Sequence, residues 1–480
     1  MQAHLHYDVT RTPLPSLNQT KPLTKGTRRR LMVSYGLGDA GTGLAATQLG
    51  FYLFPFFTDK AGLPAVMAGS ILMLIKIWDA INDPLIGWLS DHTKTRWGPR
   101  IPWMVGAAIP LGITLASMWW VPPGDVSQKT TYYILMAVLL MTAYTAVNLP
   151  FAALSTELTE DTSIRTRLNA ARFTGSILAG LSGLIIAARL LSESNAGYMA
   201  MGRITGTIAT LATLLSCWGL APFAKKARRP TGESERISLQ LKRILRNSRF
   251  LQVIGLYLLL WCGLQLMQTV CLIYLEQVMK VPSEISKWIP IPFQISALLG
   301  LQVWSFYSNK FGRISALNFG CRLWIAACIV AMFLPALSDN IAPSALLSFD
   351  NLEALKLFTL IITILIVGFG ASTAYLIPWS LLPDAIDEDP QKPAGIYTAW
   401  MVLIQKLGIG ISVQLLGLLL SLAGYRSINN CKELVECIEQ PTSAQLTIRI
   451  CMGLIPAILV GLGIVIMRRW PSSSNNPTMT

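Results

Sequence analysis

Two aspartates stand in the middle of a long apolar stretch of this 480-residue chain. In the segment 76–84 (KIWDAINDP), a helix turning 100° per residue places Lys76, Asp79 and Asp83 on one face. Two carboxylates one turn apart repel each other unless a cation, a shared proton or a lysine lies between them. Hard cations prefer oxygen ligands, so the pair predicts a cation site. The alternative is a structural ion-pair cluster with Lys76.

A lysine in the second half of the chain can complete this chemistry. Lys406 stands in the apolar segment 403–408 (LIQKLG). A lysine in hydrocarbon either loses its proton or finds an acid, and Asp79 and Asp83 are the acids expected at that depth. We therefore predict a charge network that joins the two halves of the chain. The alternative is a lysine whose long side chain reaches the membrane surface.

Polar residues also occur in two other apolar stretches. Thr145 and Asn148 are three residues apart, share a helix face and adjoin Tyr144. They can line a cavity, and hydrogen bonding between helices is an equally good interpretation. Asp39 and Gln48 lie in the first apolar stretch, where Asp39 is near enough to the start to face water.

Two charged turns are candidates for controlling access. The segment 87–100 (GWLSDHTKTRWGPR) connects two apolar stretches. We predict that Asp91, Arg96 and Arg100 latch helix ends there and form a gate without touching the solute. The acidic segment 384–389 (DAIDED) either pairs with basic loops across the two halves or is solvated.

The composition indicates whether water or lipid surrounds the chain. Of the residues, 52% are hydrophobic and only 13% are charged, and the mean hydropathy is +0.50. A soluble domain carries about a quarter charged residues. In this chain no charged residue lies between Thr130 and Thr156. About 20 apolar residues suffice to cross a bilayer as a helix. The chain is therefore predicted to be a membrane protein.

The net charge of +14 is distributed as membrane topology requires. Lys and Arg gather before the first span, in alternate loops, in the segment 225–249 and after the last span, while the other loops are nearly free of them. This positive-inside pattern predicts a multi-pass protein of the cell (inner or plasma) membrane with both termini in the cytoplasm. Because topology explains the charge, nucleic acid is not expected as a partner.

The apolar runs predict twelve transmembrane helices in two six-helix halves. We expect spans at about 31–57, 66–90, 101–121, 131–156, 173–192, 200–221, 250–279, 288–308, 314–336, 356–382, 395–423 and 445–467. Residues 1–30 and 468–480 are then cytoplasmic tails, 31–221 and 250–467 are the two bundles, and 222–249 is a basic central loop. An amphipathic surface helix is the less favoured interpretation of that loop.

A short polar–glycine–basic turn recurs after the second and the eighth span, as 89–100 and 307–313. Such duplication, with a substrate site between the halves, is common among secondary transporters. Of the eight cysteines, six lie in apolar runs, and Cys431 with Cys437 lies in an outward loop where a disulfide is one possibility. No spacing typical of metal ligands occurs among them.

The segment 77–84 with Gly87-Trp88 and 96–98 (RWG) resembles the glycoside–pentoside–hexuronide:cation symporters, the sodium:galactoside group of the major facilitator superfamily. Supporting segments are 35–38, 58–59, 148–151, 172–173 and Lys406, so the resemblance covers nearly the whole chain. It implies the major facilitator fold and a cation held by Asp79 and Asp83. It also implies that Asn82 and Thr145 lie nearby and that Lys406 belongs to the same network.

The sequence departs from the melibiose-type members of that group at the sugar. Their sugar-binding aspartates of spans one and four fall on Gly43 and Asn148 here, and Thr42 replaces a neighbouring lysine. A galactoside is therefore not implied. Segments 49–53 and 119–122 look more like the animal sodium-dependent lysophospholipid transporters, so cyclic and amphipathic solutes are both candidates. Expected around the solute are Gly43, Gln48, Tyr144, Asn148 and Arg172.

These features together predict a symporter that couples a small solute, a sugar or glycoside first, to Na⁺. H⁺ and Li⁺ are alternative coupling ions, and no other cofactor is expected. The rival functions are an amphiphile transporter and an uncoupled facilitator or exporter of the same fold. The sequence shows neither a nucleophile–base arrangement nor a metal-ligand cluster, so an enzyme is not expected. We expect a monomer.

Overall fold

The computed structural model describes residues 25–158, 162–193, 197–225, 237–338, 352–390, 394–427, 439–468 and 470, and these form helices and their connections. The segments predicted as tails lie largely outside the described residues, as do Cys431 and Cys437. The other six cysteines are buried and unpaired, as expected of small apolar side chains.

The first half of the chain forms one bundle. Its elements are α1 (Lys25–Gly38), α2 (Ala40–Pro55), the π-helical turn η2 (Phe56–Lys60), α3 (Ala65–His92), α4 (Ile101–Met118), α5 (Val126–Leu158), α6 (Thr162–Glu193) and α7 (Gly197–Ala224). The first span thus consists of three pieces, α1, α2 and η2, and it is interrupted at Asp39.

The second half forms the other bundle. Its elements are α8 (Ile237–Arg246), α9 (Ser248–Ile273), the π-helical turn η3 (Tyr274–Val278), α10 (Ser283–Ser286), α11 (Pro290–Phe311), α12 (Arg313–Phe333), α13 (Leu352–Ala371), α14 (Thr373–Asp387), α15 (Ala394–Leu422), α16 (Thr442–Arg449), the π-helical turn η7 (Ile450–Leu454) and α17 (Ile455–Met467). α13 with α14, and α16 with η7 and α17, each make one span.

Within the described residues, eleven helical segments are long and apolar enough to cross a membrane. The α1–α2–η2 span completes the twelve helices of a major facilitator fold. Several element bounds differ from the sequence prediction, most of all at α6, which begins at Thr162 where the fifth span is expected from residue 173. Helix α1 begins at Lys25, six residues before the expected first span, because residues 25–30 continue the same helix. The central segment contains α8, so it is not simply a loop.

Helix α8 has the composition of a surface helix. Ile244 is buried whereas Leu239, Leu241 and Leu245 are exposed, and basic Arg243 and Arg246 fall in its last turn. Apolar and basic residues on different faces are typical of a helix lying in the membrane interface. The described part of the segment 222–249 therefore matches the amphipathic surface helix, which was the less favoured interpretation of the sequence.

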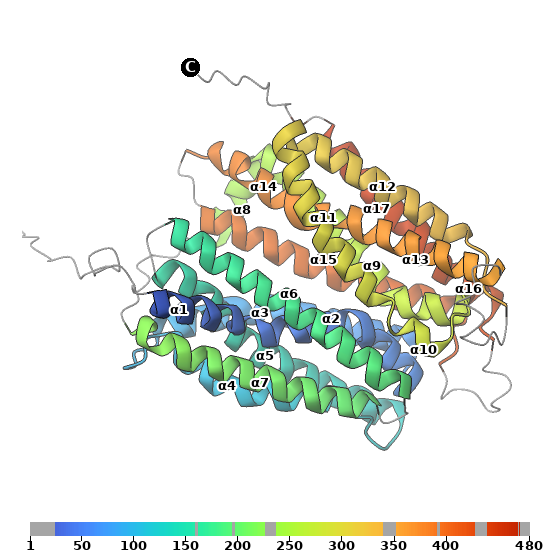
Figure 1. The fold of residues 1–480 in the computed structure, drawn as a ribbon, viewed down its shortest axis with the longest axis horizontal. Helices are drawn as coiled ribbons and strands as arrows, with labels where there is room; N and C mark the ends of the chain where they lie inside the picture. Colours follow the sequence, from blue (N-terminus) through green and yellow to red (C-terminus); the bar gives the residue numbers. More distant parts are fainter. Residues whose placement is uncertain are drawn as a thin grey trace, which may run out of the picture.

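The two bundles lie one above the other, with α1–α7 below and α8–α17 above (Figure 1). They meet along α3 and α15 and along α2 and α9. The α3–α15 seam is tight: a Cβ on Gly69 would come within 3.0 Å of the Val413 carbonyl oxygen. Helices that approach this closely use small residues, as in membrane bundles generally.

The outer surface of the bundles is apolar. Trp218, Phe333 and Leu422 are among the large side chains that stay exposed, at 72%, 74% and 77%. Water would make such a surface costly, whereas lipid chains do not. We name the two ends of the molecule by their helices: the α8 end also carries the turns after α3 and α11, and the α10 end carries η2 and η3.

Candidate functional site

The aspartates of α3 meet the lysine of α15 at the seam between the halves. Lys406 Nζ lies 2.9 Å from Asp79 Oδ2 and 2.5 Å from Asp83 Oδ2. Thr145 of α5 donates its hydroxyl to Asp79 Oδ1 at 3.1 Å and to Asp83 Oδ1 at 3.4 Å. We call Asp79 and Asp83 the carboxylate pair. The ammonium of Lys406 relieves the repulsion that two neighbouring carboxylates would otherwise feel.

Three helices hold this arrangement in place. Helix α3 runs unbroken through Pro84, so Asp79 and Asp83 stay one turn apart on one face. The Asp79 side chain is 9% exposed and that of Asp83 27%, which leaves Asp83 the more accessible. The structure thus directs Lys406 to the carboxylate pair and not to the membrane surface.

Asn82 and Lys76 occupy different surroundings from the carboxylate pair. Asn82 is buried and donates from Nδ2 to the Met141 carbonyl at 3.4 Å, which ties α3 to α5. Lys76 is half-buried and interacts electrostatically with Asp79 and Lys406. No hydrogen bond or ion pair connects Lys76 Nζ to any residue that the structure describes.

A second charged cluster lies wholly within the first half. Asp39 accepts hydrogen bonds from Thr42 Oγ1 at 2.7 Å and from Asn148 Nδ2 at 2.8 Å on one oxygen. Its other oxygen lies 3.0 Å from Arg172 Nε of α6. Asp39 is 6% exposed, so it does not face water. We call these residues the Asp39 cluster, and they bind α2, α5 and α6 together.

Helix α5 connects the two clusters. Thr145 bonds the carboxylate pair, and Asn148, one turn further on, bonds Asp39. Tyr144 interacts electrostatically with charged residues of both clusters. A shift of α5 that changes one cluster therefore changes the geometry of the other.

A cavity adjoins the carboxylate pair between the halves. Its walls are mainly apolar, and its empty space is at most about 670 Å³ including the open side. The lining residues are Ala46, Leu49, Gly50, Leu53, Leu72, Ile75, Lys76, Asp79, Met141, Tyr144, Gln265, Thr269, Ile409 and Val413. They come from α2, α3 and α5 of one half and from α9 and α15 of the other.

The residues expected around the solute divide into three groups. Tyr144 lines the cavity, and Asn148 and Arg172 belong to the Asp39 cluster. Gly43 instead packs on α6, because a Cβ there would come within 2.9 Å of Ser176 Cα. Gln48 is fully buried and donates from Nε2 to the Gly183 carbonyl at 3.1 Å, so it also faces α6.

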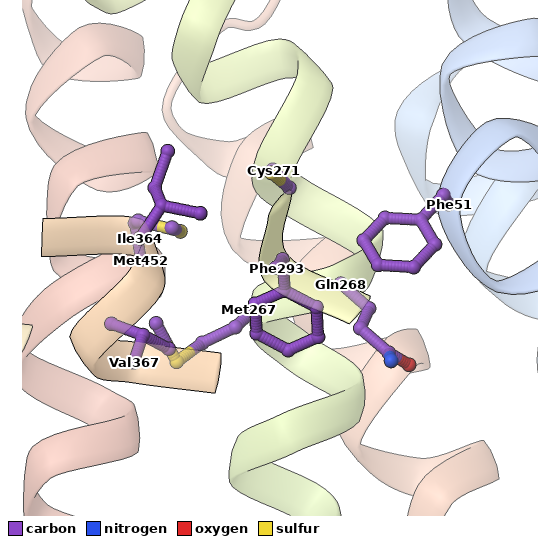
Figure 2. Close-up of a pocket in the computed structure, with 8 residues that line it drawn as sticks. All are labelled: Phe51, Met267, Gln268, Cys271, Phe293, Ile364, Val367 and Met452. Atoms are coloured by element: carbon purple, nitrogen blue, oxygen red, sulfur yellow. The ribbon is translucent and has the colours of Figure 1, made fainter. Parts of the chain in front are cut away.

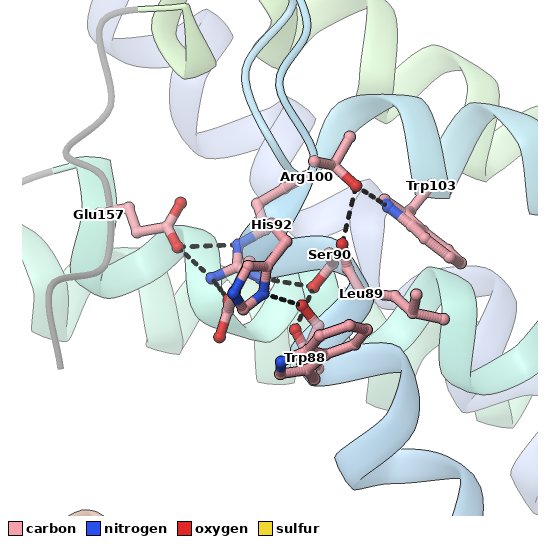
Figure 3. A network of polar contacts seen from close by, with 10 residues as sticks. Trp88, Leu89, Ser90, His92, Arg100, Trp103 and Glu157 are labelled. Carbon is pink, nitrogen blue, oxygen red and sulfur yellow. Dashed lines mark hydrogen bonds and ion pairs between the residues drawn. The ribbon is translucent and has the colours of Figure 1, made fainter. Parts of the chain in front are cut away.

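The predicted gate is a set of contacts around Arg100, at the N-terminus of α4 (Figure 3). Arg100 Nη2 lies 2.5 Å from Asp91 Oδ1 and 2.5 Å from Glu157 Oε1, and Nη1 donates to Ser90 Oγ at 2.5 Å. Burial lowers the pKa of Arg100, but bonds and charge from Glu157 and Asp91 hold it above the ordinary value. Arg96 only covers the ring of Trp97.

These contacts join the ends of α3, α4 and α5, which all belong to the first half. Glu157, the more buried of the two carboxylate partners of Arg100, was not identified from the sequence. It lies nine residues beyond Asn148 of α5 (157 − 148), a spacing that gives no periodic signal. The Arg100 cluster therefore braces one half at the α8 end.

The acidic segment 384–389 also pairs within one half. Asp384 lies 2.6 Å from Arg313, Glu388 lies 2.5 Å from Arg249, and Asp389 lies 3.3 Å from Arg243. All of these basic residues belong to the second bundle. The expectation of pairing across the halves is therefore wrong for these contacts, because the α8–α9 segment lies beside the end of α14 in the same half.

Polar contacts join the halves at the opposite, α10 end. Tyr425 donates its hydroxyl to Asp59 Oδ1 at 2.9 Å, and Tyr52 donates to the Lys287 carbonyl at 3.0 Å. Lys287 also pairs with Glu276 of η3. Tyr52 and Asp59 entered the sequence prediction only within the segments 49–53 and 58–59 of the family resemblance. Glu276, Lys287 and Tyr425 did not enter it, although the charge of Glu276 stands next to an apolar run.

The donors around the carboxylate pair suit a monovalent cation better than a transition metal. Two carboxylates and one hydroxyl are oxygen ligands of the kind that hard cations prefer. In the described part of the chain, no group of three or more His, Cys, Asp or Glu side chains is arranged to hold a metal.

Comparison with known proteins identifies the family of the chain. The family described as MFS/sugar transport protein matches residues 34–473. The uncharacterized symporter sll1374 of Synechocystis sp. is 30% identical, covering 92% of this chain and 93% of that protein. A sodium-dependent lysophosphatidylcholine symporter, 1-A of Danio rerio, is 23% identical over 92% of this chain and 85% of its own length.

A solved structure shares the same arrangement of helices. A mutant of the nucleoside transporter NupG superposes with a TM-score of 0.67 at 14% identity, covering 92% of this chain and all of the other. At this identity the similarity establishes the fold alone.

Proposed function

The chain belongs to the MFS/sugar transport protein family and is a multi-pass membrane transporter rather than an enzyme, and on that premise we propose that it is a cation-coupled symporter of a small solute. Na⁺ is the coupling ion we propose. Asp79, Asp83 and Thr145 supply its ligands, and the solute occupies the adjoining cavity between the halves.

One observation carries the proposal: Lys406 Nζ of the second half lies 2.5 Å from Asp83 Oδ2 and 2.9 Å from Asp79 Oδ2 of the first. This ammonium sits where a free cation would bind the same oxygens. A cation that enters must displace it, so cation binding alters a contact between the halves. Such a contact is what a transporter needs in order to couple ion binding to movement of its halves.

The proposed cycle follows from this exchange. Cation binding frees Lys406 from the carboxylate pair and prepares the cavity for solute. Reciprocal coupling then requires that bound solute tightens the cation. The loaded protein moves one half against the other, which opens the α8 end or the α10 end in turn. Because one chain supplies both halves, we propose that a monomer transports.

The basic residues of the α8 end, with the positive-inside rule, support a cytoplasmic α8 end. Both termini are then cytoplasmic, and the chain resides in the cell (inner or plasma) membrane. The contacts at the α10 end, such as Tyr425 with Asp59, then close the outer side. A sugar or glycoside is the first solute class to test, because the matching family is described as sugar transport. The largely apolar cavity favours an amphiphile as the second candidate.

Thermal unfolding of the purified protein in NaCl and in choline chloride tests the proposal. A ligand that binds only the folded state at a hundred times its Kd stabilises it by about 2.7 kcal/mol. We expect Na⁺ to raise the unfolding temperature of the wild type and not that of Asp79→Asn. Equal unfolding temperatures of the wild type in both salts would contradict Na⁺ coupling and favour H⁺ coupling or an uncoupled facilitator.

A further inference from the structure

A groove with room for a ligand lies between α3, α4 and α5 of the first half. Its volume is about 560 Å³, and small-molecule sites range from about 300 to 1,000 Å³. The apolar pocket around Phe51 and Phe293, in contrast, has room for only about 10 Å³ (Figure 2). We call the larger space the α4 groove, and its lining includes Ile86, Thr93, Gly106, Thr114, Leu139 and Thr142.

The α4 groove faces lipid and not the second half. Helix α4 packs against α5 and α7 and lies on the side of the first bundle that is remote from the second (Figure 1). Ile109 and Ile113 of α4 are exposed, as lipid-facing side chains are. A Cβ on Gly106 would meet no atom within 4 Å. The groove shares no lining residue with the cavity beside the carboxylate pair, so it is a separate site.

The walls of the α4 groove suit a hydrocarbon chain. Three threonines line it, and each hydroxyl donates to the backbone carbonyl four residues earlier: Thr93, Thr114 and Thr142. The hydroxyls of Thr93 and Thr142 also accept hydrogen bonds from the indoles of Trp103 and Trp78. The remaining lining residues are apolar. Because its polar groups are already bonded to the protein, the groove offers mainly apolar contacts.

The length of the α4 groove matches one leaflet of a bilayer. From Pro102 to Thr114 the helix advances by twelve residues (114 − 102), or about 18 Å. Half of the hydrocarbon core is about 15 Å thick. Trp88 and Trp97 are exposed at the α8 end, and tryptophan gathers at the level of the lipid headgroups. The groove therefore runs from the headgroups at the α8 end toward the middle of the bilayer.

Positive charges stand at the headgroup end of the α4 groove. Thr93 lines the groove, and exposed Lys94 and Arg96 follow it in the turn to α4. Neither forms an ion pair with a residue that the structure describes. The acid of the same turn, Asp91, is already paired with Arg100. Basic residues at this level attract anionic lipid headgroups, so the charge of the turn complements a lipid phosphate.

We propose that the α4 groove binds one acyl chain of an anionic phospholipid from the leaflet at the α8 end, with the lipid phosphate at Lys94 and Arg96. The chain fills the space between α3 and α4, beside the contacts of Arg100 that join the ends of the same helices. The lipid is a resident ligand and not the solute. The assignment does not depend on the proposed symport.

Two phospholipids with the same chains and different headgroup charge test the assignment. Tritiated palmitoyl-oleoyl phosphatidylglycerol and phosphatidylcholine are bound to the purified protein in detergent, in choline chloride, and bound lipid is measured by scintillation proximity. We expect phosphatidylglycerol to bind about tenfold or more tightly than phosphatidylcholine, because two basic residues face its phosphate group at the surface. The binding should not require Na⁺.

Two variants separate the headgroup from the chain. In Lys94→Gln with Arg96→Gln, the preference for phosphatidylglycerol should fall toward onefold. Gly106→Leu fills the groove, and both lipids should bind about tenfold or more weakly. Gly461→Leu is the matched control, since a Cβ on Gly461 of α17 also meets no atom within 4 Å and lies outside the groove. It should keep the wild-type affinities.

Equal binding of the two lipids by the wild type, or an unchanged preference in Lys94→Gln with Arg96→Gln, would refute the headgroup site. Unchanged affinities in Gly106→Leu would refute the groove as the site of the chain. If Gly106→Leu instead converts a dimer into a monomer in light scattering, a second copy of the chain covers the groove. Binding that requires Na⁺ and is lost in Asp79→Asn would place the phospholipid in the cavity between the halves and equally overturn the assignment.

Discussion

Charged side chains make two kinds of contact in this protein, within one half and between the halves. Within the first half, Arg100 and Arg172 each hold buried carboxylates, and Arg100 touches three side chains from two other helices. Between the halves, Lys406 touches Asp79 and Asp83, and Tyr425 touches Asp59. These contacts within the first half use the rigid, many-donor guanidinium, whereas the two contacts between the halves use an ammonium and a hydroxyl.

This difference matches what each contact must do. A half that moves as one body needs bonds that survive the transport cycle, and arginine with its fixed fork of donors provides them. A contact between the halves must break and form again. An ammonium is a compact charge that a free cation can replace at the same oxygens. Mutations should therefore separate the contacts into those that set stability and those that set coupling.

The largest effect is expected at the contact between the halves. Asp83→Asn removes one charge of the carboxylate pair, and loss of one partner of a buried charged site costs about 3 kcal/mol or more. Na⁺ binding should weaken by more than about 100-fold, and accumulation of solute against its gradient should be lost. Equilibrium binding of radioactive Na⁺ measures the first effect.

Asp125→Asn is the matched control for that change. Asp125 is exposed and accepts a hydrogen bond from the Gln128 backbone at 2.8 Å, a role that asparagine fills equally well. Its Na⁺ binding should equal that of the wild type. If Asp83→Asn bound Na⁺ as the control does, the carboxylate pair would not be the cation site.

Within the first half, Arg172→Met should lower stability without removing the response to Na⁺. The change leaves the carboxylate of Asp39 buried without its charged partner, which costs about 3–5 kcal/mol. The double variant Asp39→Asn with Arg172→Met should recover much of this loss, because no lone charge remains. Thermal unfolding with and without NaCl reports both quantities. Loss of the Na⁺ response in the double variant would make the Asp39 cluster part of the cation site.

Substitution of the equivalent arginines of the two halves should lower the free energy of unfolding by different amounts. Arg100 and Arg313 both follow a glycine with positive φ and both pair with a carboxylate at the end of the next span. The Arg100 side chain is 6% exposed and that of Arg313 34%. We expect Arg100→Gln to cost about 3 kcal/mol and Arg313→Gln about 1 kcal/mol or less. Equal losses in chemical unfolding would show that burial does not distinguish them.

The smallest effect is expected at the α10 end. Tyr425→Phe removes one hydrogen bond to Asp59, worth about 1 kcal/mol, and so shifts the balance of conformations about fivefold. A cysteine in place of Gln265, in a background without native cysteines, reports access to the cavity from the α10 side. It should react faster with a membrane-impermeant maleimide when Tyr425→Phe is also present. An unchanged rate would mean that this contact does not hold the α10 end closed.

The spans and the contact of Lys406 with the carboxylate pair could be predicted from the sequence, for physical reasons. Hydrocarbon forces long apolar runs, so charges inside them stand out and few partners exist for them. Lys406 could therefore be matched with Asp79 and Asp83 without coordinates, although 323 positions separate it from Asp83. The recurring glycine–basic turn likewise indicated that Arg100 and Arg313 occupy equivalent positions in the two halves.

Other contacts could not be found in this way. Asp39 looked close to water, and only the folded chain brings Arg172 of α6 against it. Gly43 is expected at the solute from its place in the family pattern and Gln48 from its polarity in an apolar stretch, but the rotation of α2 about its axis turns both toward α6. The rotation of a helix in a bundle depends on packing against its neighbours, which an apolar run does not specify.

Direct competition between Lys406 and Na⁺ is the central claim, and Na⁺ binding to Lys406→Met at pH 8 tests it most directly. If the ammonium occupies the oxygens that Na⁺ needs, its removal should tighten equilibrium binding of radioactive Na⁺ by about tenfold or more. If Lys406→Met instead binds Na⁺ no better than the wild type, or not at all, the lysine does not compete for the site, and the exchange that couples ion binding to the halves is refuted.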